Sequence, residues 1–257
     1  MDKNLVKEKL RKGKVCIGVW HEIGHPDIAE IQAMTGWDFM LYDTEHSPIE
    51  LTQVQSCIQV AARFATTPLI RVAWNDPVLI KKALDIGAHG LLIPWVNSEA
   101  EAQRAVESCR YPLEGIRGFG PRRASMYGTN TDDYFERFAK EEILLIVQIE
   151  TQRALENIDG ILSVEGVDVA FVGPMDLSIS LGIRQQFDNP QFKEAVQLVL
   201  RKCKEYHVIP AMDGGGTAER TKQRIDMGFR LLPLASDVDF LVEAEQTAYQ
   251  SIKDLIS

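Results

Sequence analysis

Short apolar runs alternate with longer amphipathic stretches along most of this 257-residue chain. The runs are rich in β-branched residues, and the stretches between them repeat apolar positions at helical spacing, so the pattern predicts repeated βα units. The expected strands cover residues 14–20, 37–43, 67–72, 90–95, 143–150, 167–173, 208–212 and 229–235. The expected helices include residues 50–63, 76–86, 98–109, 190–206, 217–227 and 236–255.

The set of expected strands favours a closed barrel. Eight parallel strands in roughly 250 residues are typical of an α/β protein with a (β/α)8 TIM barrel. A doubly wound sheet fits less well, because the first strand ends in Trp20-His21-Glu22 without a glycine-rich dinucleotide fingerprint. We therefore expect a single (β/α)8 barrel domain over residues 1–257. The irregular stretch 110–131, rich in Arg and Gly, is expected to cross the barrel mouth as an active-site loop.

The charge balance excludes some partners. A formal net charge of -9 and a pI near 5.1 give an acidic surface, which argues against binding to nucleic acid or to anionic membranes. No apolar run approaches the roughly 20 residues of a membrane helix, and the N-terminus is charged rather than signal-like. The four cysteines form no CxxC pair, so we expect buried thiols in a reducing compartment, the cytoplasm.

Polar residues at the ends of the expected strands are the candidates for chemistry, because active sites of these barrels lie at the carboxyl ends of the strands. Any one of them taken alone could equally be a helix cap or a solvated edge. They are Trp20, Asp43, Glu45, His46, Arg71, Glu150, residues 173–176 and Asp213.

Two carboxylates stand out among these residues. Glu150 ends a strongly apolar strand and Asp176 follows the next strand, one βα unit later, so the two should lie on one side of the mouth. A pair of carboxylates, completed by water and substrate oxygens, suits a hard divalent cation such as Mg²⁺ or Mn²⁺. The alternative is that each carboxylate caps the helix that follows it.

His46 and Arg71 also lie on consecutive units and should converge. An imidazole can carry a proton near neutral pH, and a guanidinium can stabilise an enolate or another oxyanion beside it. Carboxylates at Asp43, Glu45 and Asp85 could raise the basicity of the imidazole.

Three glycine-containing or histidine-containing patterns are weaker. Residues 21–25 match HExxH, but Gly24 and Pro26 make a continuous helix through both histidines unfavourable, so we do not expect a zinc protease. Residues 115–120 have the wrong spacing for a dinucleotide loop. Gly214–Gly216 follow the seventh strand and could bind an anion on backbone amides or form a plain turn.

Six motifs together resemble the metal-dependent pyruvate aldolases that cleave 4-hydroxy-2-oxo acids, including 4-hydroxy-2-oxoheptanedioate and 2-dehydro-3-deoxyglucarate aldolases. The resemblance runs from about residue 13 to the C-terminus. The motifs are, in order, Asp43-x-Glu45-His46; Arg71 with Asn75-Asp76-Pro77; Leu84-Asp85-Ile86-Gly87; Arg110-Tyr111-Pro112 followed by Gly115-Ile116-Arg117-Gly118; Gln148-Ile149-Glu150; and Val172-Gly173-Pro174-x-Asp176-Leu177-Ser178.

The resemblance implies reversible retro-aldol cleavage to pyruvate and an aldehyde. Glu150 and Asp176 would hold the divalent metal, Mg²⁺ or Mn²⁺ with Co²⁺ as a further candidate, which stabilises the pyruvate enolate as a Lewis acid. The pyruvate unit would be positioned by Gln148 and by the backbone around Gly173, Met175 and Asp176.

The same resemblance assigns the remaining roles. Arg71 would stabilise the enolate, and His46 would be the base for the 4-hydroxyl group, with Asp85 raising its basicity. Trp20 would contact the substrate. Family members assemble as homohexamers that exchange the last helix, here about 236–255, although that helix could equally pack on its own barrel.

The chain departs from the family pattern beside the aldehyde. Relatives usually carry an apolar Gly-Ile-Leu type of stretch after the seventh strand, where this chain has Ala211-Met212-Asp213-Gly214-Gly215-Gly216. Met175 stands where Ala or Ser is common. The acceptor preference of the relatives therefore does not carry over.

Two other functions remain open. A citrate-lyase-like or malyl-CoA-lyase-like enzyme would take a thioester, for which Arg117, Arg122 and Arg123 could supply a basic approach. A non-catalytic ligand-binding barrel is the alternative from another class of protein.

Overall fold

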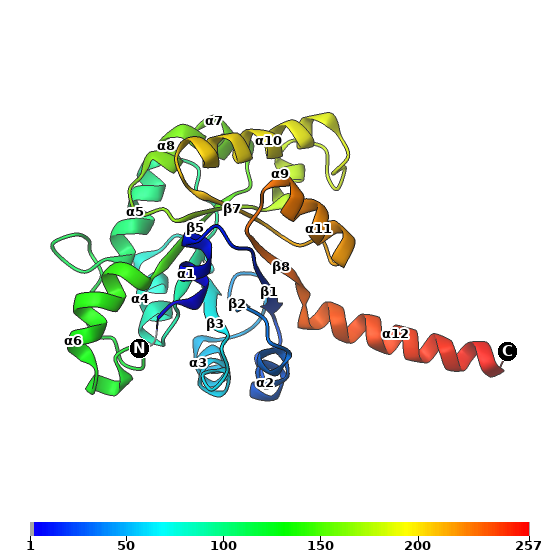
Figure 1. The fold of residues 1–257 in the computed structure, drawn as a ribbon, viewed down its shortest axis with the longest axis horizontal. Helices are drawn as coiled ribbons and strands as arrows, with labels where there is room; N and C mark the ends of the chain where they lie inside the picture. Colours follow the sequence, from blue (N-terminus) through cyan, green and yellow to red (C-terminus); the bar gives the residue numbers. More distant parts are fainter. Residues whose placement is uncertain (1–2, 257) are drawn as a thin grey trace.

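The computed structural model describes residues 3–256, and its eight strands form a closed barrel in chain order (Figure 1). All neighbouring strands are parallel. Every strand expected from the apolar runs is present, with its ends shifted by a few residues, and the predicted TIM barrel is confirmed. The strands are Cys16–His21 (β1), Phe39–Asp43 (β2), Thr67–Arg71 (β3), Gly90–Ile93 (β4), Leu144–Ile149 (β5), Val169–Val172 (β6), Ile209–Met212 (β7) and Leu231–Ser236 (β8).

Helices surround the barrel, and those predicted from the amphipathic stretches are all present. Several begin at signals that the sequence carries: Asp76 caps α4 by accepting bonds from the N–H groups of Val78 and Leu79, and proline follows the cap. The helices are Leu5–Arg11 (α1), Pro26–Thr35 (α2), Leu51–Ala61 (α3), Pro77–Asp85 (α4), Glu99–Cys109 (α5), Thr131–Asp133 (α6), Gln152–Glu156 (α7), Ile158–Ser163 (α8), Pro174–Ser180 (α9), Pro190–Glu205 (α10), Ala218–Met227 (α11) and Asp237–Ile256 (α12), with the 3-10 turn Met126–Gly128 (η1) and the π-helix Tyr134–Glu142 (η2).

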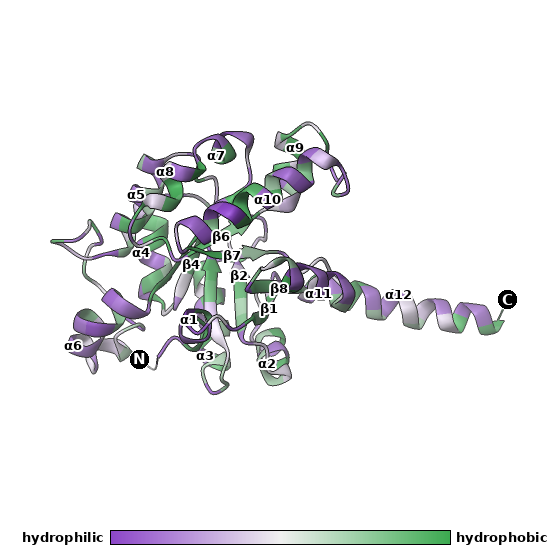
Figure 2. Ribbon diagram, turned by 45° about the horizontal axis from the view of Figure 1, so that its top comes forward, coloured by the Kyte–Doolittle hydropathy of each residue, from purple (hydrophilic) through white to green (hydrophobic). Residues whose placement is uncertain are grey.

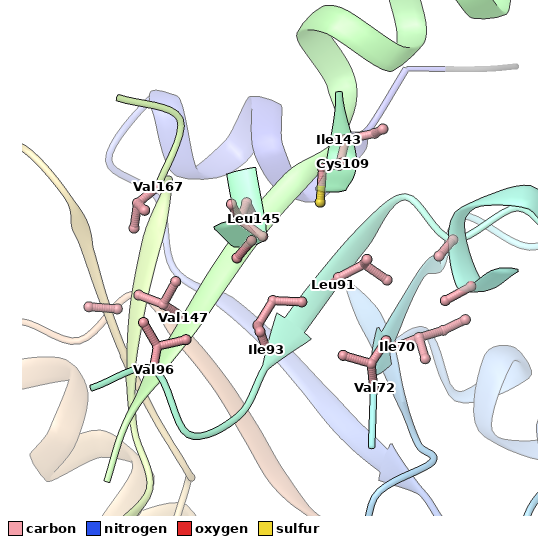
Figure 3. Packing of buried hydrophobic residues seen from close by; sticks show 14 of the residues in the cluster. Ile70, Val72, Leu91, Ile93, Val96, Cys109, Ile143, Leu145, Val147 and Val167 are labelled. Atoms are coloured by element: carbon pink, nitrogen blue, oxygen red, sulfur yellow. The ribbon is translucent and has the colours of Figure 1, made fainter. Parts of the chain in front are cut away.

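Side chains alternate between two cores along each strand. Those that point inward, such as Phe39 and Leu41, fill the barrel interior, which α1 closes at the amino end of the strands with Val6 and Leu10. Those that point outward pack beneath the helices, as Figure 3 shows for the residues that β3, β4 and β5 contribute. Because the interior is filled, a ligand cannot enter the barrel itself, and the site expected at the carboxyl ends of the strands lies above this core.

The stretch 110–131 does not cross the mouth, so that prediction is wrong. It follows α5 rather than β4, and α5 has already brought the chain back to the amino end of the strands. There the guanidinium of Arg117, which is 1% exposed, donates to the Asp85 carboxylate at 2.7 Å and to the Tyr134 hydroxyl at 2.9 Å. The Ala124 N–H also donates to the Asp85 carbonyl. The loop 110–131 therefore packs against the outside of the barrel, at the amino end of the strands.

The last helix, α12, leaves the barrel (Figure 1). Residues 238–256 are all exposed, and both polar and apolar residues alternate along this projecting helix (Figure 2). Its first turn alone is anchored, where the Asp237 carboxylate accepts from the N–H of Glu22 at 2.9 Å and Phe240 stacks on Trp37. The alternative in which this helix packs along its own barrel is therefore wrong.

Two further expectations concern the whole described chain. All four cysteines are buried and unpaired, as predicted. Among the helices of residues 3–256, none has the length and apolar character that crossing a membrane requires.

Candidate active site

A cavity of about 950 Å³ opens at the carboxyl ends of the strands. Most of the predicted site residues lie in its wall, and α10 and α11 form its outer side. The predicted residues that line it are Trp20, His46, Arg71, Gln148, Gly173, Met175, Asp176 and Asp213.

Arg71, the last residue of β3, is held by the neighbouring strand. Its Nε and Nη2 donate to the two oxygens of Asp43 at 2.8 and 2.7 Å, a bidentate pair that holds one edge of the guanidinium. Burial disfavours charge on both groups, yet the pair raises the pKa of Arg71 and lowers the pKa of Asp43. The strand register, which places Asp43 opposite Arg71, makes this pair possible.

Glu45 connects Arg71 with His46. Its Oε2 lies 3.3 Å from Arg71 Nε and 3.8 Å from His46 Nε2. The Glu45 side chain is 9% exposed and burial raises its pKa, whereas the His46 side chain is 63% exposed at the rim. Glu45 is therefore the carboxylate that faces the imidazole.

Glu150 follows β5 and is 2% exposed. One carboxylate oxygen accepts from the N–H of Trp95 at 2.7 Å, and the other accepts from Nε2 of Gln148. Burial, together with the negative charges of Glu45 and Asp176, raises the pKa of Glu150 to about 7. This carboxylate is thus buried in a site where its charge is not balanced.

Gly173, at the turn from β6 into α9, allows the Gln148 and Glu150 side chains to lie against the backbone of this turn. A Cβ atom at this position would lie 2.8 Å from Gln148 Nε2 and 2.9 Å from both Cβ and Oε2 of Glu150. The turn then places Asp176 in the first turn of α9, on the cavity wall. Only glycine leaves enough room for Glu150 to lie directly behind this turn.

Neither carboxylate is a helix cap, so that alternative is wrong. Gly173 occupies the cap position of α9 and Asp176 lies inside the helix. Thr151, not Glu150, caps α7 by accepting from the Ala154 N–H at 2.9 Å. Groups of three or more His, Cys, Asp or Glu with metal-site geometry are absent from residues 3–256.

Asp85 is the predicted residue that the structure does not bring to this site within one chain. It ends α4, just before β4 begins, and therefore lies at the amino end of the barrel, where Arg117 binds it. His46 lies at the opposite end. The expected elements already carried this signal, because a residue that ends helix 76–86 and precedes the parallel strand 90–95 lies at the amino end of that strand.

The structure also decides the HExxH pattern at residues 21–25 and the glycines at 214–216. His21 ends β1 and His25 caps α2, so the two histidines share no helix, as expected. The N–H groups of Gly214, Gly215 and Gly216 all donate within the chain, to the carbonyls of Pro233 and Leu234 and to the Asp213 carboxylate. A plain turn is the result, with no amide left for an anion at these three residues.

Trp95 is a contributor that the sequence did not indicate. It lies just beyond β4 with a φ of 56°, in the left-handed region that non-glycine residues rarely adopt. This conformation directs its N–H to Glu150. Its apolar character placed it in the expected strand 90–95, and only the backbone angle reveals its role.

Comparison with known proteins agrees with this architecture. The family model for HpcH/HpaI aldolase/citrate lyase matches residues 16–242. The chain belongs to this family. The resemblance noted from the six motifs is thereby confirmed, and the aldolases and lyases of the HpcH/HpaI family are enzymes of carbon–carbon bonds.

Individual HpcH/HpaI relatives cover most of the chain. A hydroxypyruvate/pyruvate aldolase of Sagittula stellata is 44% identical over 81% of this chain and 82% of its own length. A 5-keto-4-deoxy-D-glucarate aldolase of Citrobacter koseri is 34% identical over 97% and 96%. The crystal structure of an HpcH/HpaI aldolase/citrate lyase family protein from Burkholderia cenocepacia has a TM-score of 0.92 and 31% identity, covering 97% of this chain and 99% of that one.

Proposed function

We propose that this HpcH/HpaI family member catalyses the reversible retro-aldol cleavage of a 4-hydroxy-2-oxo acid to pyruvate and an aldehyde, with a divalent cation. The observation that carries the proposal is the convergence of the Arg71 guanidinium, the His46 imidazole and the Asp176 carboxylate on one cavity at the carboxyl ends of the strands. The Glu150 carboxylate is buried directly behind Gly173 in the wall of this cavity. The names of the aldolase relatives support the same reaction.

The acidic groups fit a hard cation. Glu150 is buried among the like charges of Glu45 and Asp176, and the Oε1 atom of Gln148 is buried with no hydrogen-bond partner among residues 3–256. A cation held by Glu150 and Asp176 would balance this charge, and oxygen ligands of this kind suit Mg²⁺ or Mn²⁺, with Co²⁺ as a further candidate. When bound, such an ion supplies Lewis-acid activation of the 2-oxo acid.

The side chains of this chain would perform the other tasks. Arg71 lines the cavity, and the bidentate pair with Asp43 uses Nε and Nη2, so Nη1 remains to donate to the 2-oxo oxygen as negative charge develops there. His46 would take the proton of the 4-hydroxyl group, and Glu45 would stabilise the resulting imidazolium. We assign Asp85 no part in the chemistry of its own chain.

The remaining contacts would orient the substrate. Gln148 and the backbone around Gly173, Met175 and Asp176 would hold the pyruvate unit, and Trp20 would contact it from the opposite wall. Met175 and Asp213 reach the cavity on the side expected for the aldehyde, so the acceptor would differ from that of relatives with smaller or apolar groups there.

Pyruvate release from a 4-hydroxy-2-oxo acid tests the proposal directly. We expect EDTA to abolish release and added Mg²⁺ or Mn²⁺ to restore it. Glu150→Gln keeps the size of the side chain and an acceptor for the Trp95 N–H, but removes the charge that would hold the ion. Unchanged rates after metal removal and in Glu150→Gln would refute the proposed reaction.

Two alternatives make different predictions in the same assays. The thioester enzyme loses its expected basic approach, because Arg117 is buried at the amino end and Arg123 donates to the Ile86 carbonyl there. Calorimetry can still test this alternative: a heat of binding when acetyl-CoA is titrated into the protein would favour the thioester enzyme. A non-catalytic barrel would give no exchange of deuterium into the pyruvate methyl group, whereas the aldolase should exchange it.

We also propose that residues 1–257 form one barrel domain of a cytoplasmic homohexamer. The exposed apolar side chains of α12 support assembly through this helix, with exchange between subunits. Four buried, unpaired thiols support a reducing compartment.

A further inference from the structure

The guanidinium of Arg71 is constrained on its edge but needs a second contact to fix its face. Asp43 binds Nε and Nη2, and Nη1 forms no hydrogen bond to any residue in 3–256. A pair that holds one edge still permits the plane to tilt about that edge. The direction of the free Nη1 therefore depends on what lies against the flat face.

Trp20 covers that face. Its ring centroid lies 4.4 Å from the guanidinium carbon, within the range of a cation–π contact. The indole is 8% exposed and meets Phe171 edge to face at 6.2 Å inside the barrel. The orientation of this ring thus determines the surface on which Arg71 rests.

Asp213, two strands from Trp20 around the barrel, holds the indole. It follows β7, and its Oδ2 accepts from Trp20 Nε1 at 3.1 Å. The carboxylate is itself fixed, because Oδ1 accepts from the Gly215 N–H at 2.8 Å and lies 3.6 Å from Arg224 Nη1. A continuous set of contacts therefore runs from Asp213 through Trp20 to Arg71.

We propose that Asp213 is a positioning residue for Arg71: by fixing the Trp20 indole, it directs the free Nη1 of the guanidinium into the cavity. This inference rests on the proposed function for its catalytic consequence, but not for the contacts themselves. Asp213 lies 142 positions beyond Arg71 in the numbering, and the two meet only through the ring of Trp20.

Nuclear magnetic resonance of ¹⁵N-labelled protein tests the contacts without turnover. The chain has four tryptophans, so Trp20→Phe identifies the indole N–H signal of Trp20 and Arg71→Lys identifies the Nε–H signal of Arg71. We expect Asp213→Asn to shift the indole N–H signal of Trp20 and to speed solvent exchange of the Nε–H of Arg71. If the indole signal moves while the Arg71 signal keeps its position and exchange rate, Asp213 does not position Arg71.

Deuterium exchange into pyruvate gives the catalytic readout. Asp213→Asn should lower kcat on the order of tenfold, the effect of one hydrogen bond to a charged group, with little change in KM. Because Asp213 acts through Trp20, the double variant Trp20→Phe/Asp213→Asn should be no slower than Trp20→Phe alone. Additive losses would overturn the proposal.

Asp226→Asn is the matched control. It makes the same chemical change on α11, where Asp226 pairs with Lys222 outside the cavity, and should leave both signals and kcat unchanged. Absence of exchange in the wild-type protein would refute the proposed function, while the two signals would still decide whether Asp213 positions Arg71.

Discussion

At the scale of single residues, the site depends on charges that are fixed by neighbours from other strands. Arg71 is 11% exposed and Asp43 is 1% exposed, and each supplies the counter-charge that the other needs in a buried position. This arrangement costs little reorganisation when charge develops on a substrate oxygen, which is the basis of electrostatic catalysis.

Loss of this guanidinium should therefore affect the rate. Arg71→Ala should lower kcat by about 10² to 10³, the effect of removing one preorganised oxyanion donor. Steady-state kinetics of pyruvate release measures this. Arg71→Lys retains a charge for Asp43 and separates a catalytic loss from misfolding, and Arg63→Ala, at an arginine outside the cavity, is the control. Wild-type kcat in both Arg71 variants would contradict the assigned role.

At the scale of elements, short turns at the carboxyl ends of the strands decide which groups meet. The turn from β6 to α9 passes directly over Glu150, and Trp95, the second residue after β4, turns its N–H toward the same carboxylate. Both turns bring together residues from different βα units. The approach of Gly173 to Glu150 and the bond from the Trp95 N–H to Glu150 cannot be predicted from the helix and strand pattern.

Addition of a single methyl group should disturb this arrangement. Gly173→Ala would place a Cβ 2.8 Å from Gln148 Nε2 and 2.9 Å from Glu150, so both side chains must move. We expect on the order of a 10²-fold loss of activity from displaced reacting groups, with the circular dichroism spectrum unchanged. Gly160→Ala lies in α8 and meets only the side chain of Glu99, at 3.2 Å, so it should be nearly neutral. Equal activity of the two variants would refute this role for Gly173.

At the scale of the whole molecule, α12 is the element that the barrel leaves uncovered. Tyr249, Ile252 and Leu255 are 61 to 85% exposed on a helix that contacts the barrel only near its start. Exposed apolar side chains in this number are typical of an interface rather than of a free surface.

Charge on that helix should weaken assembly. Ile252→Glu combined with Leu255→Glu would place charges in the proposed contact, and light scattering should report a smaller assembly than the wild type forms. Lys253→Glu changes charge on the same helix without removing an apolar contact, and should assemble normally. The proposed role of α12 fails if the double variant keeps the wild-type mass.

Acid stability should depend on a histidine at the amino end of the barrel. Burial lowers the pKa of His89 from 6.5 to about 3, and its Nδ1 is buried with no hydrogen-bond partner within residues 3–256. The unfolded chain takes up a proton below about pH 6.5 that the folded chain resists, so stability is lost as the pH falls through 6.5 toward 3.

Urea unfolding at several pH values measures this effect. One such proton contributes a slope of up to about 1.4 kcal/mol per pH unit. His89→Gln should reduce the slope without removing it, because burial also lowers the pKa of His21. An unchanged slope in His89→Gln would contradict the assignment.

The sequence by itself determined the barrel and most of its mouth. Strand and helix periodicity, caps such as Asp76 and the order of strand ends are local properties, and barrel geometry turns consecutive strand ends into neighbours. His46, Arg71, Gln148 and Asp176 could therefore be assigned to one cavity before any coordinates existed, and the structure brings them together.

Only the tertiary structure decided the remaining features. The expected elements place both Asp85 and Arg117 at the amino end, but the pairing of the Arg117 guanidinium with the Asp85 carboxylate comes from the packing of the loop 110–131. The contacts of Glu150 with Trp95, and of Asp213 with Trp20, join positions far apart in the chain through backbone angles and ring orientations. Such contacts leave no periodic signal, because their geometry is set by how whole elements pack rather than by any local pattern.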